Sequence, residues 1–350
     1  MSNINNTPGA EGPVIVADET VLQVIDDTTS DRASSIASST TSIASSILQA
    51  RIENGRSYHK YKDNTPIPMM RRKATDLVSV DSLLAWALLT PLNADLQHNL
   101  FLLTTGYRLG LAPPADPESS VKRVLDIGTG TGLWAIEFGD EHPEAEILGV
   151  DLSPVQTSLL TLYSVPPNVR FEIDDLEEPW TFSEPFDYIH SRTMTSSISD
   201  WDKFFKQCYD HLEPGGWLEV QDGHIRLESD DGTLTPENAL SRWIDKMEEA
   251  CNKLGRPFVN CPGLVKVMEK AGFVDVTMTK YKWPTNSWPM DPHYRELGIW
   301  TCENLLAGVE ALTLGPFTRA LEWTPEECQV LMIDVRKEFK DRSIHAYFPM

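Results

Sequence analysis

The stretch 124-VLDIGTGTGLWAIEF-138 joins a β-like run, three alternate glycines and an apolar run with helical character. A strand, a glycine-rich turn and a helix in this order are typical of nucleotide-binding α/β folds. A dinucleotide site carries Gly or Ala at the third position of its GxGxxG pattern, but that position here is Leu133. The spacing that fits is DxGxGxG, formed by Asp126, Gly128, Gly130 and Gly132.

The charge of Asp126 indicates which nucleotide the loop binds. A carboxylate beside the loop repels a pyrophosphate at the helix N-terminus and attracts an ammonium or a sulfonium group. S-adenosylmethionine (SAM) carries both of these groups and has no phosphate. The pattern therefore predicts a SAM-binding loop that includes Gly128, Thr129, Gly130 and Gly132.

Two further acidic positions support this prediction. Asp151 ends the next β-like run, where a carboxylate can accept hydrogen bonds from both ribose hydroxyls. Asp174 and Asp175 follow the third β-like run and can accept from the adenine amino group, with Leu152 and Leu176 packing on the ring faces. An acid at a strand end is often only a turn or cap residue, so the prediction rests on the combination with the glycines.

Strand-like and helix-like runs alternate between residues 121 and 222, which favours a parallel sheet covered by helices on both faces. The formal net charge of −22 argues against direct binding of nucleic acid, which needs a basic surface. Five scattered cysteines without a CxxC pair read as free thiols, and no metal site is expected. Neither a secretory signal nor a run of about 18 apolar residues is present, so we expect no membrane association and a cytoplasmic or nuclear location.

Over residues 45–350 the sequence resembles class I SAM-dependent methyltransferases, and more narrowly the LaeA-like family of fungal methyltransferases. The segments that carry the resemblance are 53-ENGRSYHKY-61, 95-DLQHNLFLL-103, 125-LDIGTGTGLWAIEF-138, 149-GVDLSPVQ-156, 171-FEIDDLEEPW-180, 187-DYIHSR-192, 197-SISDW-201, 211-HLEPGGWLEVQD-222, 231-DGT-233, 288-WPMDPHYRELGIW-300, 311-ALTLGPFTRALEW-323 and 343-SIHAYFPM-350. The resemblance implies a Rossmann-like, mostly parallel twisted sheet of seven strands with a helical cap, SAM as cofactor, and a role in fungal secondary metabolism.

The resemblance also implies a domain plan. We expect a disordered Ser/Thr-rich tail over 1–45, an N-terminal helical lid over 46–117, and a methyltransferase domain over 118–350 with a helical cap inserted at about 230–345. Family members continue beyond the HAY motif with an apolar strand inserted antiparallel at the sheet edge, whereas this sequence stops at Met350. We therefore expect the C-terminal antiparallel strand to be missing and the strand at 274–283 to lack one partner.

Methyl transfer needs a positioned acceptor and a dry site more than it needs a dedicated base. His190 ends the fourth β-like run and is the first candidate to contact cofactor or acceptor, while His224, after the fifth run, is a candidate general base. Each can instead be a structural or loop histidine. Tyr58 and Tyr61 can bond the methionine carboxylate or lie against the sulfonium, or can simply pack a helix on the sheet.

Two functions remain open at this point. The first is a methyltransferase acting on O, N or S of a small-molecule acceptor, which the family resemblance implies is a fungal secondary metabolite. The alternative is a nuclear LaeA-like regulator of secondary metabolism that acts through protein partners. We favour the first because function is read from the site and not from the fold. The sequence does not identify the acceptor.

Overall fold

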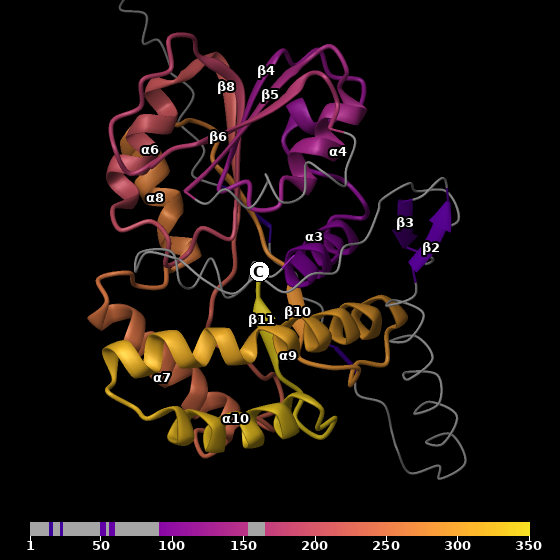
Figure 1. Cartoon of the computed structure of the whole chain (residues 1–350), viewed down its shortest axis with the longest axis vertical. Coiled ribbons are helices and arrows are strands. Elements are labelled where there is room, and N and C mark those ends of the chain that lie inside the picture. Colours follow the sequence, from indigo (N-terminus) through magenta and orange to yellow (C-terminus); the bar gives the residue numbers. More distant parts are fainter. Residues whose placement is uncertain (1–13, 17–21, 24–49, 54–55, 60–90, 153–164) are drawn as a thin grey trace, which may run out of the picture.

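The computed structural model describes residues 14–16, 22–23, 50–53, 56–59, 91–152 and 165–350 (Figure 1). Its centre is a sheet of five parallel strands in the order β6-β5-β4-β7-β8. The strands are β4 (Arg123–Ile127), β5 (Glu146–Asp151), β6 (Val169–Ile173), β7 (Phe186–Arg192) and β8 (Leu212–Gln221). The inner strands are almost continuous buried runs, as expected of a parallel sheet covered on both faces. Within the described residues this sheet has five strands and not the seven implied by the resemblance.

Helices cover both faces of the sheet, as predicted. Figure 1 shows α4 (Leu133–Glu141) on one side and α6 (Trp201–Asp210) with α8 (Cys261–Ala271) on the other. The α6 helix begins where the sequence predicts it, because the side chain of Asp200 accepts a hydrogen bond from the backbone N–H of Lys203. A short 3-10 turn, η2 (Pro113–Ala115), leads into β4.

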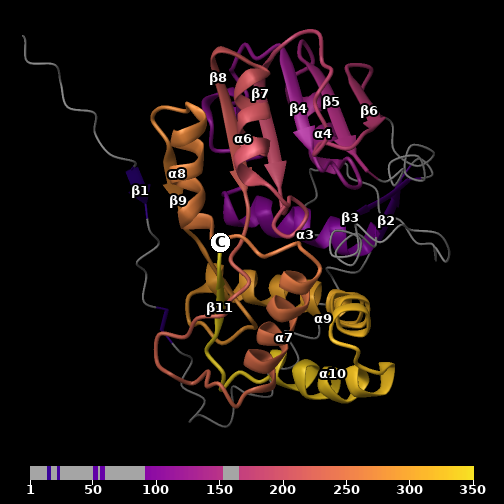
Figure 2. The ribbon, with the colours of Figure 1, turned by 90° about the vertical axis from the view of Figure 1, so that its left-hand side faces the viewer.

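A second layer of helices lies beyond the carboxyl ends of the strands (Figure 2). It consists of α7 (Ala239–Lys253), α9 (Pro292–Ala320) and α10 (Pro325–Phe339), which share one apolar core. The α10 helix starts with the predicted capping box between Thr324 and Glu327. Helix α3 (Pro91–Thr104) lies between this cap and the sheet and contributes Leu100 and Phe101 to the cap core.

The region 274–283 differs from the expectation of a single strand that lacks a partner. It forms two short strands, and each has a partner: β9 (Thr277–Thr279) pairs parallel with β1 (Val14–Val16), and β10 (Lys282–Pro284) pairs antiparallel with β11 (Tyr347–Pro349). The expectation of unpaired ladder groups there is therefore wrong. An antiparallel C-terminal strand is present, formed by the tyrosine of the HAY motif, Tyr347, and the two residues that follow it.

The N-terminal segments also depart in part from the expected plan. Within the segment expected to be a disordered tail, β1 is a strand and Leu22 is buried against Trp288 and Tyr347. At the start of the expected helical lid, β2 (Ala50–Glu53) and β3 (Arg56–His59) form an antiparallel hairpin. The helix expected at 81–89 lies outside the described residues. No helix in the described part of the chain is long and apolar enough to cross a membrane.

Candidate functional site

The glycine loop connects β4 to α4 at the carboxyl edge of the sheet. Gly128, Gly130 and Gly132 all have left-handed backbone angles, with φ of 66°, 54° and 82°. A Cβ atom at Gly132 would lie 2.6 Å from the ring of Phe171, and one at Gly128 would lie 2.3 Å from the sulfur of Met194. The loop can follow this path only without side chains at these positions. Its backbone N–H groups are bonded within the protein: those of Gly128 and Thr129 donate to the carbonyl of Val150, and that of Gly132 donates to the carbonyl of Thr129.

Asp126 is buried beneath this loop and does not face the crevice directly. Its residue exposure is 2%. One carboxylate oxygen accepts a hydrogen bond from the Thr129 hydroxyl at 2.5 Å, and the other lies 2.8 Å from Nδ1 of His190. The geometry thus ties Asp126 to the loop and to β7, whereas the sequence suggested direct attraction of a cofactor cation.

His190 lies in the interior, paired with Asp126 in the β4–β7 register. Its side chain has no exposed surface, and its ring stacks on Trp134 with centroids 3.7 Å apart and an angle of 4° between the planes. Burial lowers the pKa of His190 although the neighbouring Asp126 acts to raise it. The side chain therefore lies in the core between the sheet and α4, stacked on Trp134, and is not exposed to the crevice. Sequence reasoning placed it at the strand end, but β7 continues to Arg192.

The acids after β5 and β6 lie at the same edge of the sheet. A carboxylate oxygen of Asp151 accepts a hydrogen bond from the Gly130 N–H at 2.9 Å, so this acid and the glycine loop are adjacent. Asp174 and Asp175 are exposed, and the N–H of Asp174 donates to the carbonyl of Asp151 at 3.2 Å. Leu152 is 51% exposed and available for a ring contact.

Leu176 does not fit its expected role on the adenine ring. Its side chain is buried in the apolar core on the α6 face of the sheet, where it is 6% exposed. Its carbonyl accepts hydrogen bonds from Trp180 and Gln207. The two tyrosines of the expected lid are not assessed by the structure: Tyr58 lies in β3, without a described side chain, and Tyr61 lies outside the described residues.

A buried polar network fixes α3 above the sheet edge. Arg192 donates to Gln221 at 2.9 Å, its Nη1 lies 3.1 Å from Nδ1 of His98, and its guanidinium lies 4.5 Å from the ring centre of Phe101. His98 in turn bonds Glu137 of α4 at 2.9 Å. Burial lowers the pKa of Arg192 to about 10. This side chain remains charged at neutral pH and joins three elements around the site.

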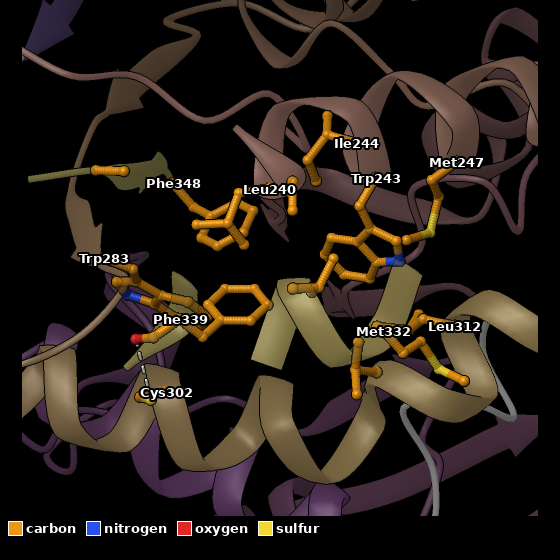
Figure 3. Close-up of a cluster of buried hydrophobic side chains, with 14 of the residues drawn as sticks. Leu240, Trp243, Ile244, Met247, Trp283, Cys302, Leu312, Met332, Phe339 and Phe348 are labelled. Atoms are coloured by element: carbon orange, nitrogen blue, oxygen red, sulfur yellow. Dashed lines mark hydrogen bonds between the residues drawn. The ribbon is translucent and has the colours of Figure 1, made fainter. Parts of the chain in front are cut away.

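A cavity of about 130 Å³ lies between the sheet edge and the helical cap. Its walls come from α3, the loops after β7 and β8, α7, α9, β10 and β11. The lining residues are Gln97, Thr193, Thr195, Ser196, Asp222, Gly223, His224, Ile225, Trp243, Ile244, Met247, Phe258, Trp283, Thr301, Asn304, Leu305, Leu312, Phe348 and Met350. Figure 3 shows Trp243, Trp283 and Phe348 converging in the cap core. The indole N–H groups of Trp243 and Trp283 donate to Thr313 and Thr104, so both rings offer mainly apolar surface.

The sheet-side wall of this cavity contains Asp222 and His224. The carboxylate of Asp222 accepts hydrogen bonds from the N–H groups of Thr195 at 2.7 Å and Gly223 at 2.9 Å. Burial raises the pKa of Asp222 to about 7 despite these bonds. His224 lines the cavity, and its backbone N–H donates to the carbonyl of Pro349 of β11 at 2.9 Å.

The loop after β7 is strained where it meets the cavity. Thr193 and Ser196 adopt left-handed angles, with φ of 52° and 60°, although neither is glycine. Such residues cost on the order of 1–3 kcal/mol and are concentrated at functional sites. Sequence reasoning missed these two residues because backbone strain leaves no mark in composition. It also missed Asn304, for which the available signal was its position four residues after Trp300, on the buried face of α9.

The chain is similar to known methyltransferases. A family model described as a methyltransferase domain matches residues 96–278. The chain is 42% identical over 313 residues to methyltransferase pytC of Aspergillus terreus, covering 89% of each chain. It is 36% identical over 258 residues to the secondary metabolism regulator LAE1 of Cochliobolus heterostrophus, covering 72% of this chain and 82% of the relative. A solved structure of phosphoethanolamine N-methyltransferase 2 from Haemonchus contortus with S-adenosyl-L-methionine aligns with a TM-score of 0.42 and 19% identity, over 78% of this chain and 59% of that one.

Proposed function

The chain belongs to the LaeA-like family of fungal SAM-dependent methyltransferases, and on this premise we propose that it methylates an oxygen, nitrogen or sulfur atom of a small secondary metabolite. The observation that supports a small-molecule acceptor is the cavity between the cap and the carboxyl edge of the sheet. Its walls are mainly aromatic and aliphatic, with few polar groups, as in sites for small organic molecules.

The crevice residues fit SAM. The backbone of Gly128, Gly130 and Gly132 forms a cradle that side chains would fill, and Asp151 lies beside it as an acceptor for ribose hydroxyls. Asp174, Asp175 and Leu152 are the accessible residues for the adenine. When bound, SAM supplies a methyl group activated by a positively charged sulfur. Asp126 would act on this site through Thr129 and His190, which hold the loop in place.

The cap residues would exclude water from the reaction and orient the acceptor. Trp243 and Trp283 come from α7 and β10, and Phe348 comes from the C-terminal strand, so the wall depends on the packing of the whole cap. A dry, shaped site is the main contribution that a protein makes to methyl transfer. We place this reaction in the cytoplasm or the nucleus.

The test uses the purified protein, SAM with a radioactive methyl group, and a metabolite extract from the source organism with this gene deleted. We expect label in an organic-soluble product. Asp151→Ala should prevent both SAM binding and product formation, whereas Asp140→Ala, at an exposed position near the end of α4, is the matched control that should not. Label recovered only in protein, with none in organic-soluble products, would favour the regulatory alternative that the similarity to LAE1 raises.

A further inference from the structure

Three polar groups in the cavity wall are already used within the protein. The indole N–H groups of Trp243 and Trp283 are donated to threonines, as described above. The hydroxyl of Thr301 donates to the carbonyl of Leu297 one turn earlier in α9, at 2.8 Å. These groups cannot select a ligand, because their hydrogen bonds are already formed.

Asn304 is different. It lies three residues after Thr301 on α9, lines the same cavity and is 4% exposed, yet its Oδ1 has no hydrogen-bond partner among the described residues. A buried carbonyl oxygen without a partner is unfavourable, and native structures contain few of them. Its neighbours in the wall, Leu305 and Leu312, offer no donor. The unpaired oxygen therefore indicates a ligand group that donates a hydrogen bond at the cap side of the cavity.

The other polar wall lies on the sheet side, at Asp222. A carboxylate has about four acceptor positions, and the backbone N–H groups of Met194, Thr195 and Gly223 leave one of them free. The Oδ1 atom of Asn304, on α9, and the carboxylate of Asp222, after β8, are therefore both hydrogen-bond acceptors. The same cavity is also lined by Trp243, Trp283, Phe258 and Phe348, and its volume of about 130 Å³ is close to the roughly 150 Å³ of an engineered cavity that binds benzene.

We infer that the part of the acceptor that enters this cavity is one aromatic ring with a hydrogen-bond donor at each end. Asn304 binds the first donor. The second donor faces Asp222 and carries the atom that is methylated. This inference rests on the proposed function and adds the class of acceptor and two residues that recognise it. Asn304 determines specificity by accepting from the distal donor. Asp222 accepts the proton of the reacting O–H or N–H group.

The reaction balances with these groups alone. The acceptor's oxygen or nitrogen forms a bond to the methyl carbon, and the carbon–sulfur bond breaks with its electron pair left on sulfur. The proton of the acceptor moves to the carboxylate of Asp222, and then to solvent. No oxidant or metal is needed.

The first test compares two probes of nearly equal size on the wild-type protein. Hydroquinone has a donor at each end of the ring, whereas 4-fluorophenol replaces one hydroxyl with a fluorine that cannot donate. We expect kcat/KM for methyl transfer to be roughly tenfold or more higher for hydroquinone, because an unpaired Asn304 disfavours the fluorinated ring. Binding of both probes in the presence of S-adenosylhomocysteine, followed by NMR titration, should show the same preference. Equal values for the two probes would refute the role of Asn304.

The second test uses variants. Asn304→Leu should reduce the preference for hydroquinone to near unity and leave the melting temperature unchanged or higher, because it removes a buried unpaired oxygen. Thr301→Val, on the same helix face, should keep the wild-type preference, since its hydroxyl bonds only its own helix. Asp222→Asn should lower kcat by about 100-fold or more with little change in KM. If the wild type labels metabolites in the extract but neither binds nor methylates either probe, the inference fails while the proposed function stands.

Discussion

Replacing His190 with phenylalanine tests how the glycine loop is held. The Nδ1 atom of His190 lies 2.8 Å from one oxygen of Asp126, and the Thr129 hydroxyl donates to the other. A carboxylate only accepts hydrogen bonds, so Nδ1 carries the proton and Nε2 is a bare acceptor, which has no partner among the described residues. Phenylalanine keeps the planar ring that stacks on Trp134 and removes the donor to Asp126.

The expected cost follows from these contacts. A hydrogen bond to a charged group contributes about 1.5–3 kcal/mol, and Asp126, at 2% exposure, cannot replace it with bulk water. Removal of the unpaired Nε2 returns about 1 kcal/mol at most. The free energy of unfolding should therefore fall by about 2 kcal/mol, measured by urea denaturation. Since Asp126 also anchors Thr129, the affinity for SAM measured by calorimetry should fall as well.

His142 provides the matched control. It is also a buried histidine with an unpartnered Nε2, and it stacks on Phe138 with centroids 4.3 Å apart, but no carboxylate is bonded to it in the described part of the chain. His142→Phe should leave stability and SAM affinity near the wild-type values. If His190→Phe is as stable as His142→Phe and binds SAM equally well, the hydrogen bond between His190 and Asp126 does not hold the loop.

Three further predictions concern pH and packing. Burial lowers the pKa of His190 in the folded state, so as pH falls the unfolded chain takes up this proton before the folded chain does. The free energy of unfolding should therefore fall by up to about 1.4 kcal/mol per pH unit from this group as pH drops below its unfolded pKa near 6.5. Urea denaturation at pH 5 to 8 checks this. Because the pKa of Asp222 is raised to about 7, methyl transfer should increase as pH rises through about 7, and a flat pH–rate profile would contradict its role as a proton acceptor. Gly298→Ala should lower the melting temperature, because the added Cβ would lie 2.0 Å from the backbone oxygen of Asn286. In Gly263→Ala, the control, the nearest atom to the added Cβ is 3.8 Å away, so the free energy of unfolding should rise by up to about 1 kcal/mol through helix propensity.

The strands and helices around the glycine loop could be predicted from the sequence because the patterns that specify them lie within short segments. The glycine turn connects β4 to α4 as predicted, and the next two β-like runs form β5 and β6. The pairing of the short C-terminal strands was not predictable in the same way. Strands β1 and β9 come from opposite ends of the chain, and β10 pairs with β11 across two helices. Such pairing is set by tertiary packing and has only a weak local signal.

The site shows the same division between local and long-range information. The spacing of the glycines and the position of Asp151 are properties of one short segment, and the structure keeps them adjacent. The partner of Asp126 depends on the register between β4 and β7, which places His190 opposite it and buries both. The sequence identifies both residues as candidates, but it does not show that His190 and Asp126 are hydrogen-bonded to each other. His190 was therefore expected to face the acceptor.

The cofactor and the acceptor are consequently recognised by parts of the chain with different architecture. The residues proposed to hold SAM come from the ends of three neighbouring parallel strands, within 126–175. The acceptor cavity is lined by residues from Gln97 to Met350 that meet only after the cap has packed on α3 and β11 has paired with β10. Changes in the cap can therefore alter the acceptor without disturbing the glycine loop. This separation is why the proposed role of Asn304 concerns the acceptor alone, whereas the glycine motif concerns the cofactor.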